Sequence, residues 1–78
     1  MNIKESVKQD FILLGKHIKK LRESEGLSIK ELSLKTGIST QYLQKIEKGV
    51  AYGLLFDRHL LKIATALNVK MQELFSFI

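Results

Sequence analysis

The chain has 78 residues and a formal net charge of +5, from 13 Lys and Arg against 8 Asp and Glu, and it contains no cysteine and no proline. This length predicts one small domain, residues 1–78, and the absence of cysteine excludes a disulfide framework and any cysteine-ligated metal. No apolar run approaches the roughly 18 residues of a membrane span, and the N-terminus lacks the apolar region of a signal peptide, so we expect a cytoplasmic protein that does not enter a membrane.

The apolar residues of the first third recur at steps of three and four, which predicts a helix. This stripe runs through Ile3, Val7, Phe11, Leu14, Ile18 and Leu21. Asn2 is a candidate N-cap, although the helix can also begin near Ser6, and Gly26 is expected to end it as a left-handed residue.

Two short helices with their own caps are predicted next. Ser28 is expected to cap the first of them, and Glu31 is placed to complete a capping box. Gly37 supplies the positive φ that a tight turn needs, Ser39 caps the following helix, and Gly49 ends it.

The last third of the chain predicts two further helices. The fourth runs from Phe56 to Leu67, with apolar residues at helical spacing, and a short fifth runs from about Lys70 to Phe75. Because no segment has the pattern of a strand, we predict an all-α fold with five helices in a compact arrangement.

Residues 29–48 form a unit of short helix, glycine turn and second short helix. Leu32, Leu43 and Ile46 supply apolar contacts, and Ser33 is small where the second helix is expected to cross close to the first. These features are typical of a helix-turn-helix, whose second helix lies in the major groove of DNA.

The positive charge is concentrated around this unit. Residues 14–50 hold eight Lys and Arg against four Glu, so four of the five excess charges lie there. A basic segment in a small domain favours a polyanionic partner. The alternative is a solvated surface that only keeps the protein in solution.

Several stretches in a fixed order complete the pattern: Leu14–Arg22, Gly26–Ser28, Lys30–Leu32, Gly37–Ser39, Leu43, Ile46–Gly49, Leu61–Val69 and Glu73–Leu74. Together they resemble the phage repressor/Cro-type (XRE) family of helix-turn-helix domains over about residues 13–75. The resemblance implies a five-helix, repressor-like fold that binds double-stranded DNA. Small stand-alone domains of this type resemble phage or mobile-element repressors and restriction–modification controllers.

Two departures from the family pattern affect the expected contacts. Where the family usually has a glutamine that helps to grip DNA, at the start of the second helix, this chain has Ile29. The segment Val50–Phe56 lacks the usual proline and is longer than in the family, where it normally lies near the DNA backbone and the dimer contact.

Helical geometry leaves one side of the third helix open, because Leu43 and Ile46 face the core. The expected base contacts on that side are Thr40, Gln41, Gln44 and Lys45. A glutamine amide pairs bidentately with adenine, and a lysine can reach guanine O6 and N7. The expected phosphate contacts are Ser28, Lys30, Tyr42 and Lys48. Ser28 and Lys30 lie at the N-terminus of the second helix, which also favours a phosphate. The alternative is that these residues are the solvated faces of two helices.

The resemblance also implies an ion pair between Arg22 and Glu47, which would tie the first helix to the end of the recognition helix. Such a pair would orient that helix without contacting bases. The alternative is two unrelated surface charges.

No catalytic residue, metal site or cofactor is expected. His17 and His59 are the only histidines, and neither has a second ligand at metal-binding spacing. The glycines form no phosphate-binding loop, and no nucleophile has a base nearby. We also expect no small-molecule effector, because the domain leaves no room for a ligand-binding module.

The C-terminal residues are unusually apolar, and we expect them to form a homodimer contact through Met71, Phe75, Phe77 and Ile78. The alternative is that this tail folds back against the first helix and completes the monomer. Ile3 and Val7 are a second candidate surface, because the family-like region begins only after them.

The sequence thus predicts a sequence-specific DNA-binding transcriptional regulator, a repressor that binds an inverted-repeat operator as a homodimer. Its two recognition helices would enter successive major grooves about 34–36 Å apart. The alternative is a protein-binding module with the same fold, such as an antitoxin, which Ile29 and the apolar segment Val50–Phe56 favour.

Overall fold

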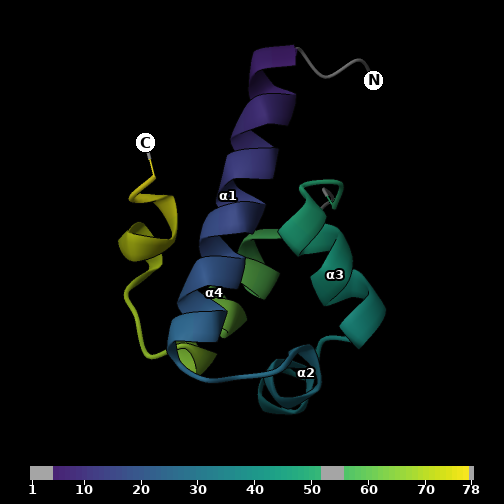
Figure 1. Ribbon diagram of the computed structural model, residues 1–78, viewed down its shortest axis with the longest axis vertical. Helices are drawn as coiled ribbons and strands as arrows, with labels where there is room; N and C mark the ends of the chain where they lie inside the picture. Colours follow the sequence, from purple (N-terminus) through teal and green to yellow (C-terminus); the bar gives the residue numbers. More distant parts are fainter. Residues whose placement is uncertain (1–4, 52–55, 78) are drawn as a thin grey trace.

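The computed structural model describes residues 5–51 and 56–77. Its elements in chain order are α1 (Glu5–Ser24), α2 (Ile29–Thr36), α3 (Thr40–Lys48), α4 (Phe56–Ala66) and the 3-10 helix η1 (Met71–Phe75), as Figure 1 shows. These described residues include no strand, so the predicted all-α fold is confirmed.

The last element differs from the prediction. The expected fifth helix over Lys70–Phe75 is the 3-10 helix η1, so the described residues form four α-helices rather than five. The side chain of Lys70 makes no capping hydrogen bond, and the N–H of Glu73 donates to the carbonyl of Lys70, three residues earlier. That spacing is the pattern of a tight 3-10 turn.

The outer ends of α1 and α4 also refine the prediction. The candidate cap Asn2 and the first apolar residue Ile3 lie outside the described residues. The end of α4 comes one residue before the predicted Leu67. Asn68 adopts a left-handed φ of 59°, and its N–H donates to the carbonyl of Thr65, which closes the helix.

The caps of α2 and α3 are those that the sequence predicts. The hydroxyl of Ser28 accepts the N–H of Glu31 at 3.0 Å, and the carboxylate of Glu31 accepts the N–H of Ser28 at 2.9 Å. The hydroxyl of Ser39 accepts the N–H of Tyr42 at 3.1 Å. Gly37 ends α2 with a φ of 74°, which favours glycine and turns the chain directly into α3.

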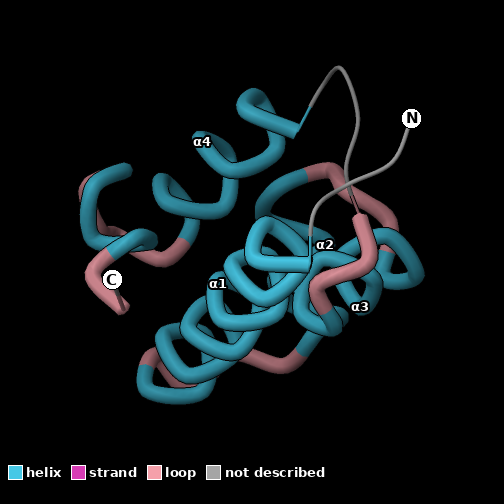
Figure 2. The backbone as a smooth tube through the Cα atoms, turned by 90° about the horizontal axis from the view of Figure 1, so that it is seen from above, coloured by secondary structure: helices cyan, strands magenta, loops and turns pink. Residues whose placement is uncertain are grey.

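Buried side chains from all the helices form the core. The largest fully buried ones are Ile18, Leu32, Leu43, Ile63, Leu67 and Leu74. Figure 2 shows α3 on one side of α1 and the C-terminal segment on the other, and α2 packs against both α3 and α4. Leu32, Leu43 and Ile46, which were predicted to supply the apolar contacts between α2 and α3, are all buried.

The first turns of α1 extend beyond the rest of the molecule (Figure 1). Val7 belongs to the predicted apolar stripe and is 40% exposed, whereas Leu14 and Ile18 further along α1 are buried. The stripe is helical in the described residues, and of its members there only Leu14 and Ile18 are buried.

Two glycines let α1 and α3 approach closely. A Cβ atom on Gly15 would collide with the carbonyl oxygens of Ile46 and Glu47, and one on Gly49 would collide with the backbone of Ile12. Only glycine allows backbones to come this near to each other. The last turn of α3 is thereby held against α1.

Candidate nucleic-acid interface

The third helix presents one continuous polar face. Leu43 and Ile46 are buried in the core and fix the rotation of α3 about its axis. At about 100° per residue, the remaining side chains of that face cover an arc of about 140°. They are the half-buried Thr40 and the exposed Gln41, Gln44, Lys45 and Lys48. The structure thus brings together the four expected base contacts and Lys48 on one side of α3.

Tyr42 lies at the edge of this face rather than on it. Its ring packs against the core and meets the ring of His59 on α4, with the centroids 4.8 Å apart. The side chain of Tyr42 is half-buried, whereas the other expected phosphate contacts, Ser28, Lys30 and Lys48, are exposed.

The N-terminus of α2 holds Ser28 and Lys30, both exposed. The N–H of Ser28 is already bound by the carboxylate of Glu31, and this hydrogen bond, together with that to the hydroxyl of Ser28, lowers the pKa of Glu31. The carboxylate of Glu31 therefore already places a negative charge at the N-terminus of α2. This charge reduces the attraction of that helix end for a phosphate.

Arg22 and Glu47 form an ion pair between α1 and α3. The guanidinium Nε donates to Glu47 Oε2 at 2.7 Å, and a second nitrogen donates to Oε1 at 3.1 Å. The third bond, 2.7 Å to the carbonyl of Leu27, reaches the loop before α2. The two side chains are only 9% and 8% exposed, and the hydrogen bond that Arg22 donates to the carboxylate of Glu47 raises the pKa of Arg22. The pair thus joins α1, the α1–α2 loop and α3.

Beside this pair lies a cleft of about 290 Å³ where α1, α2 and α3 meet. Its walls are formed by Lys19, Arg22, Ile29, Gln44, Glu47 and Lys48. Lys19 was not among the expected contacts. Lys19 lies three residues before Arg22, so the two side chains are on the same side of α1. Because Arg22 was expected to pair with Glu47 on the third helix, this spacing could have predicted that Lys19 lies near the same helix.

The C-terminal segment both completes the core and leaves apolar surface exposed. Leu74 is buried, and Met71 and Phe77 pack against the core. Phe75 remains 37% exposed. Ile78 lies outside the described residues.

This segment is fixed to α1 by His17. The Nε2 atom of His17 lies 2.9 Å from the carbonyl oxygen of Glu73 and 2.9 Å from the hydroxyl of Ser76. The ring of Phe77 lies 6.1 Å from that of His17. The tail therefore folds back on the first helix over most of its described length.

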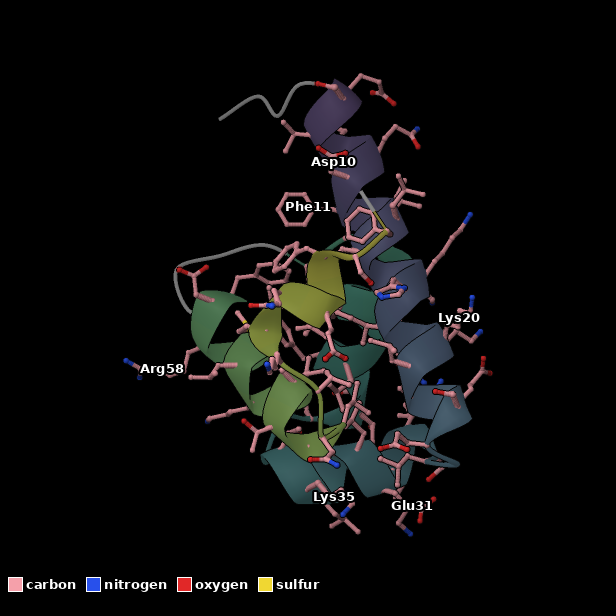
Figure 3. All side chains as sticks on the ribbon, turned by 90° about the vertical axis from the view of Figure 1, so that its left-hand side faces the viewer. Asp10, Phe11, Lys20, Glu31, Lys35 and Arg58 are labelled. Carbon is pink, nitrogen blue, oxygen red and sulfur yellow. The ribbon has the colours of Figure 1, made fainter. Side chains whose placement is uncertain are left out.

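An apolar groove of about 350 Å³ separates the first half of α1 from the start of α4 and the C-terminal segment. Its apolar lining includes Val7, Phe11, Phe56, Phe75 and Phe77. Two carboxylates, Asp10 and Asp57, also line it. Figure 3 shows Asp10 and Phe11 on the part of α1 that rises above the C-terminal segment.

Neither a metal site nor a membrane span is found in the part of the chain that the structure describes. No group of three or more His, Cys, Asp or Glu side chains is placed to hold a metal ion there. None of the described helices combines the length and the apolar character that a bilayer crossing requires.

Comparison with known proteins gives consistent matches. A profile of helix-turn-helix domains, HTH_3, matches residues 18–74. The HTH-type transcriptional regulator SlrR of Bacillus subtilis (strain 168) is 36% identical over 63 residues, which are 81% of this chain and 41% of SlrR. The chain therefore spans less than half the length of that relative.

Two solved structures share the fold. The restriction-modification controller protein C.AhdI from Aeromonas hydrophila has a TM-score of 0.79 and 33% identity, over 86% of this chain and 98% of C.AhdI. An HTH_3 family transcriptional regulator from Vibrio cholerae has a TM-score of 0.78 and 28% identity, over 90% of this chain and 38% of that protein. The chain belongs to the HTH_3 family of helix-turn-helix domains, which confirms its resemblance to the phage repressor/Cro-type (XRE) domains.

Proposed function

We propose that this protein is a sequence-specific DNA-binding transcriptional regulator that acts in the cytoplasm. The observation that supports this best is the polar face of α3, where Gln41, Gln44, Lys45 and Lys48 are exposed together. A face with amide and ammonium groups on one helix matches the donors and acceptors in the major groove. The relatives include a transcriptional regulator and a restriction-modification controller, which supports the same function.

The ion pair between Arg22 and Glu47 gives this face a fixed orientation. Base readout requires a helix whose side chains are held in place by the scaffold. Arg22 supplies this support by bonding both α3 and the carbonyl of Leu27 just before α2. The residues that contact bases are then presented by a rigid unit.

We further propose that the protein is a repressor that binds an inverted repeat as a homodimer. The apolar groove and Phe75 at its edge support self-association, since an exposed apolar patch of this kind is typical of an interface. Two copies related by a twofold axis would place their α3 helices in successive major grooves, about 34–36 Å apart. A dimer bound in this way over a promoter would exclude the polymerase.

The proposal is tested by selecting the protein on a random library of double-stranded DNA, followed by a salt titration on the enriched sequence. We expect an inverted-repeat motif to be enriched. Log affinity should fall by about 0.9 per phosphate contact for each log unit of salt.

No enriched motif, together with binding that does not respond to salt, would contradict the proposal. That result would favour the protein-binding alternative, an antitoxin-like module. Ile29 is the observation in its favour, because an apolar side chain lies in the cleft beside α3.

A further inference from the structure

The apolar groove between α1, α4 and the C-terminal segment is lined by four phenylalanine rings. The rings of Phe11 and Phe56 meet edge to face with their centroids 5.4 Å apart, and those of Phe75 and Phe77 lie 6.5 Å apart. The volume of the groove, about 350 Å³, lies within the range of small-molecule sites, about 300–1,000 Å³. The groove therefore offers an aromatic surface to a compact ligand.

Two carboxylates at the walls of the groove have no partner of opposite charge among the described residues. Asp10 on α1 and Asp57 in the first turn of α4 are exposed, and neither forms an ion pair or a hydrogen bond with another described residue. Neither has a basic residue three or four positions away in its own helix, where a compensating side chain would lie. Figure 3 shows Arg58 pointing outward from α4, away from Asp10. The groove thus has an uncompensated negative charge in a chain whose net charge is +5.

These walls define the charge and the shape of a ligand. A positive charge is attracted by the two carboxylates and by the faces of the aromatic rings. An apolar body is stabilised when it leaves water for a surface of phenylalanine rings. A bare metal ion lacks such a body, and the described residues place no group of three or more His, Cys, Asp or Glu side chains to hold one. An organic cation has both the charge and the apolar body.

We propose that the groove binds an organic cation, an amine with a compact aromatic or aliphatic body, with its ammonium group toward Asp10 and Asp57 and its body against the four phenylalanines. The sequence predicts no small-molecule effector, because it leaves no room for a separate ligand-binding module, whereas the groove lies within the helical domain itself. Phe75 at its rim is also part of the proposed dimer contact. A bound cation therefore competes with the second copy, a consequence that rests on the proposed homodimer.

The test uses three probes that share a phenylethyl body and differ in charge: phenethylammonium, phenethyl alcohol and hydrocinnamate. Each is titrated into the protein at neutral pH, and the backbone amide signals are followed by NMR. We expect the ammonium ion to bind about 3- to 30-fold more tightly than the alcohol, the range of a cation on aromatic rings, and the carboxylate to bind most weakly. The signals that shift should belong to the first half of α1, the start of α4 and η1.

Asp10→Asn/Asp57→Asn removes both charges and keeps the shape of the side chains. In this variant the ammonium ion should bind no more tightly than the alcohol, and the affinity for the alcohol should stay that of the wild type. Glu23→Gln/Glu25→Gln is the matched control, because it removes two negative charges from exposed glutamates that do not line the groove. This control should keep the wild-type preference for the ammonium ion, and thermal unfolding checks that both variants are folded.

Equal affinity for the three probes, or a preference for the ammonium ion that survives in Asp10→Asn/Asp57→Asn, would overturn the proposed site. Shifts confined to amides away from the groove would overturn it too. None of these titrations involves DNA, so a failure of the proposed function leaves their outcome unaffected.

Sedimentation equilibrium with and without phenethylammonium tests the competition with the second copy. Loss of the dimer when the groove is saturated supports the competition, and a dimer that persists contradicts the competition alone. A protein that is monomeric without the probe contradicts the proposed homodimer and leaves the result of the titrations standing.

Discussion

Single residues in this protein have effects that depend on the partners supplied by other helices. Arg22 is the clearest case, because its three hydrogen bonds reach Glu47 on α3 and the carbonyl of Leu27. The side chain of Arg22 is only 9% exposed, so water cannot solvate its charge when Glu47 is removed. The pair therefore acts as one unit.

Arg22→Ala should lower the free energy of unfolding by about 3–5 kcal/mol, because it leaves the carboxylate of Glu47 buried and unpaired. Denaturant unfolding measures this loss. Arg22→Met/Glu47→Leu, which removes both charges and keeps the volume, should lose much less. A loss of only about 0–1 kcal/mol with Arg22→Ala would mean that the pair behaves as an exposed one.

Gln41→Ala tests whether the polar face of α3 contacts bases. The loss of a bidentate amide contact to adenine should cost about 1–3 kcal/mol of binding on the selected duplex and relax the preference at one base pair. Gln72→Ala, an exposed glutamine on η1, is the control and should have no effect. If Gln41→Ala weakens binding equally on all sequences, the side chain contacts the backbone instead.

At the scale of the element, α2 begins with a reciprocal cap that depends on pH. The backbone N–H of Ser28 and then its hydroxyl favour the ionised form of Glu31, which lowers its pKa in the folded state. A lowered folded pKa adds stability above the unfolded pKa, and this contribution disappears as the pH falls through the folded value. The cap should therefore weaken in acid.

Glu31→Gln should reduce stability at neutral pH and have a smaller effect in acid, where the wild-type carboxylate is protonated too. Thermal unfolding between pH 7 and a pH below the usual range of a carboxyl group measures this convergence. Glu25→Gln is the control, since Glu25 is an exposed glutamate in the turn before α2. An equal difference between Glu31→Gln and wild type at every pH would show that the charge of Glu31 does not stabilise the cap.

At the scale of the whole molecule, the C-terminal segment serves the fold of the monomer and is also part of the proposed dimer contact. Met71 and Phe77 pack against the core, and His17 fixes the segment to α1, so much of the apolar tail serves the monomer. Phe75 is left at the rim of the groove with 37% of its surface exposed. A substitution of Phe75 is therefore expected to affect the proposed dimerisation more than the folding of the monomer.

Phe75→Ser should shift the protein from dimer to monomer and weaken binding to the inverted repeat, with little loss of monomer stability. Sedimentation equilibrium over a concentration series measures the association. Leu34→Ser is the matched control, because Leu34 is a strongly exposed apolar residue on α2 that does not line the groove. An unchanged association with Phe75→Ser would exclude Phe75 from the interface and leave the first turns of α1 as the next candidate.

The sequence by itself determined the four α-helices, the caps of α2 and α3, and the open face of α3. These features depend on residues a few positions apart, such as Ser28 with Glu31 or Leu43 with Ile46, and local geometry suffices to place them. Gly37 marked the turn between α2 and α3 for the same reason.

Only the tertiary structure decided which surfaces meet. It placed Lys19 in the same cleft as Lys48, turned the ring of Tyr42 toward His59, and made Gly15 a point of close approach between α1 and α3. It also left Val7 partly exposed, although Val7 shares the apolar stripe of Ile18. Such relations join residues that are distant in the chain, and they depend on how the helices pack, which no local pattern specifies.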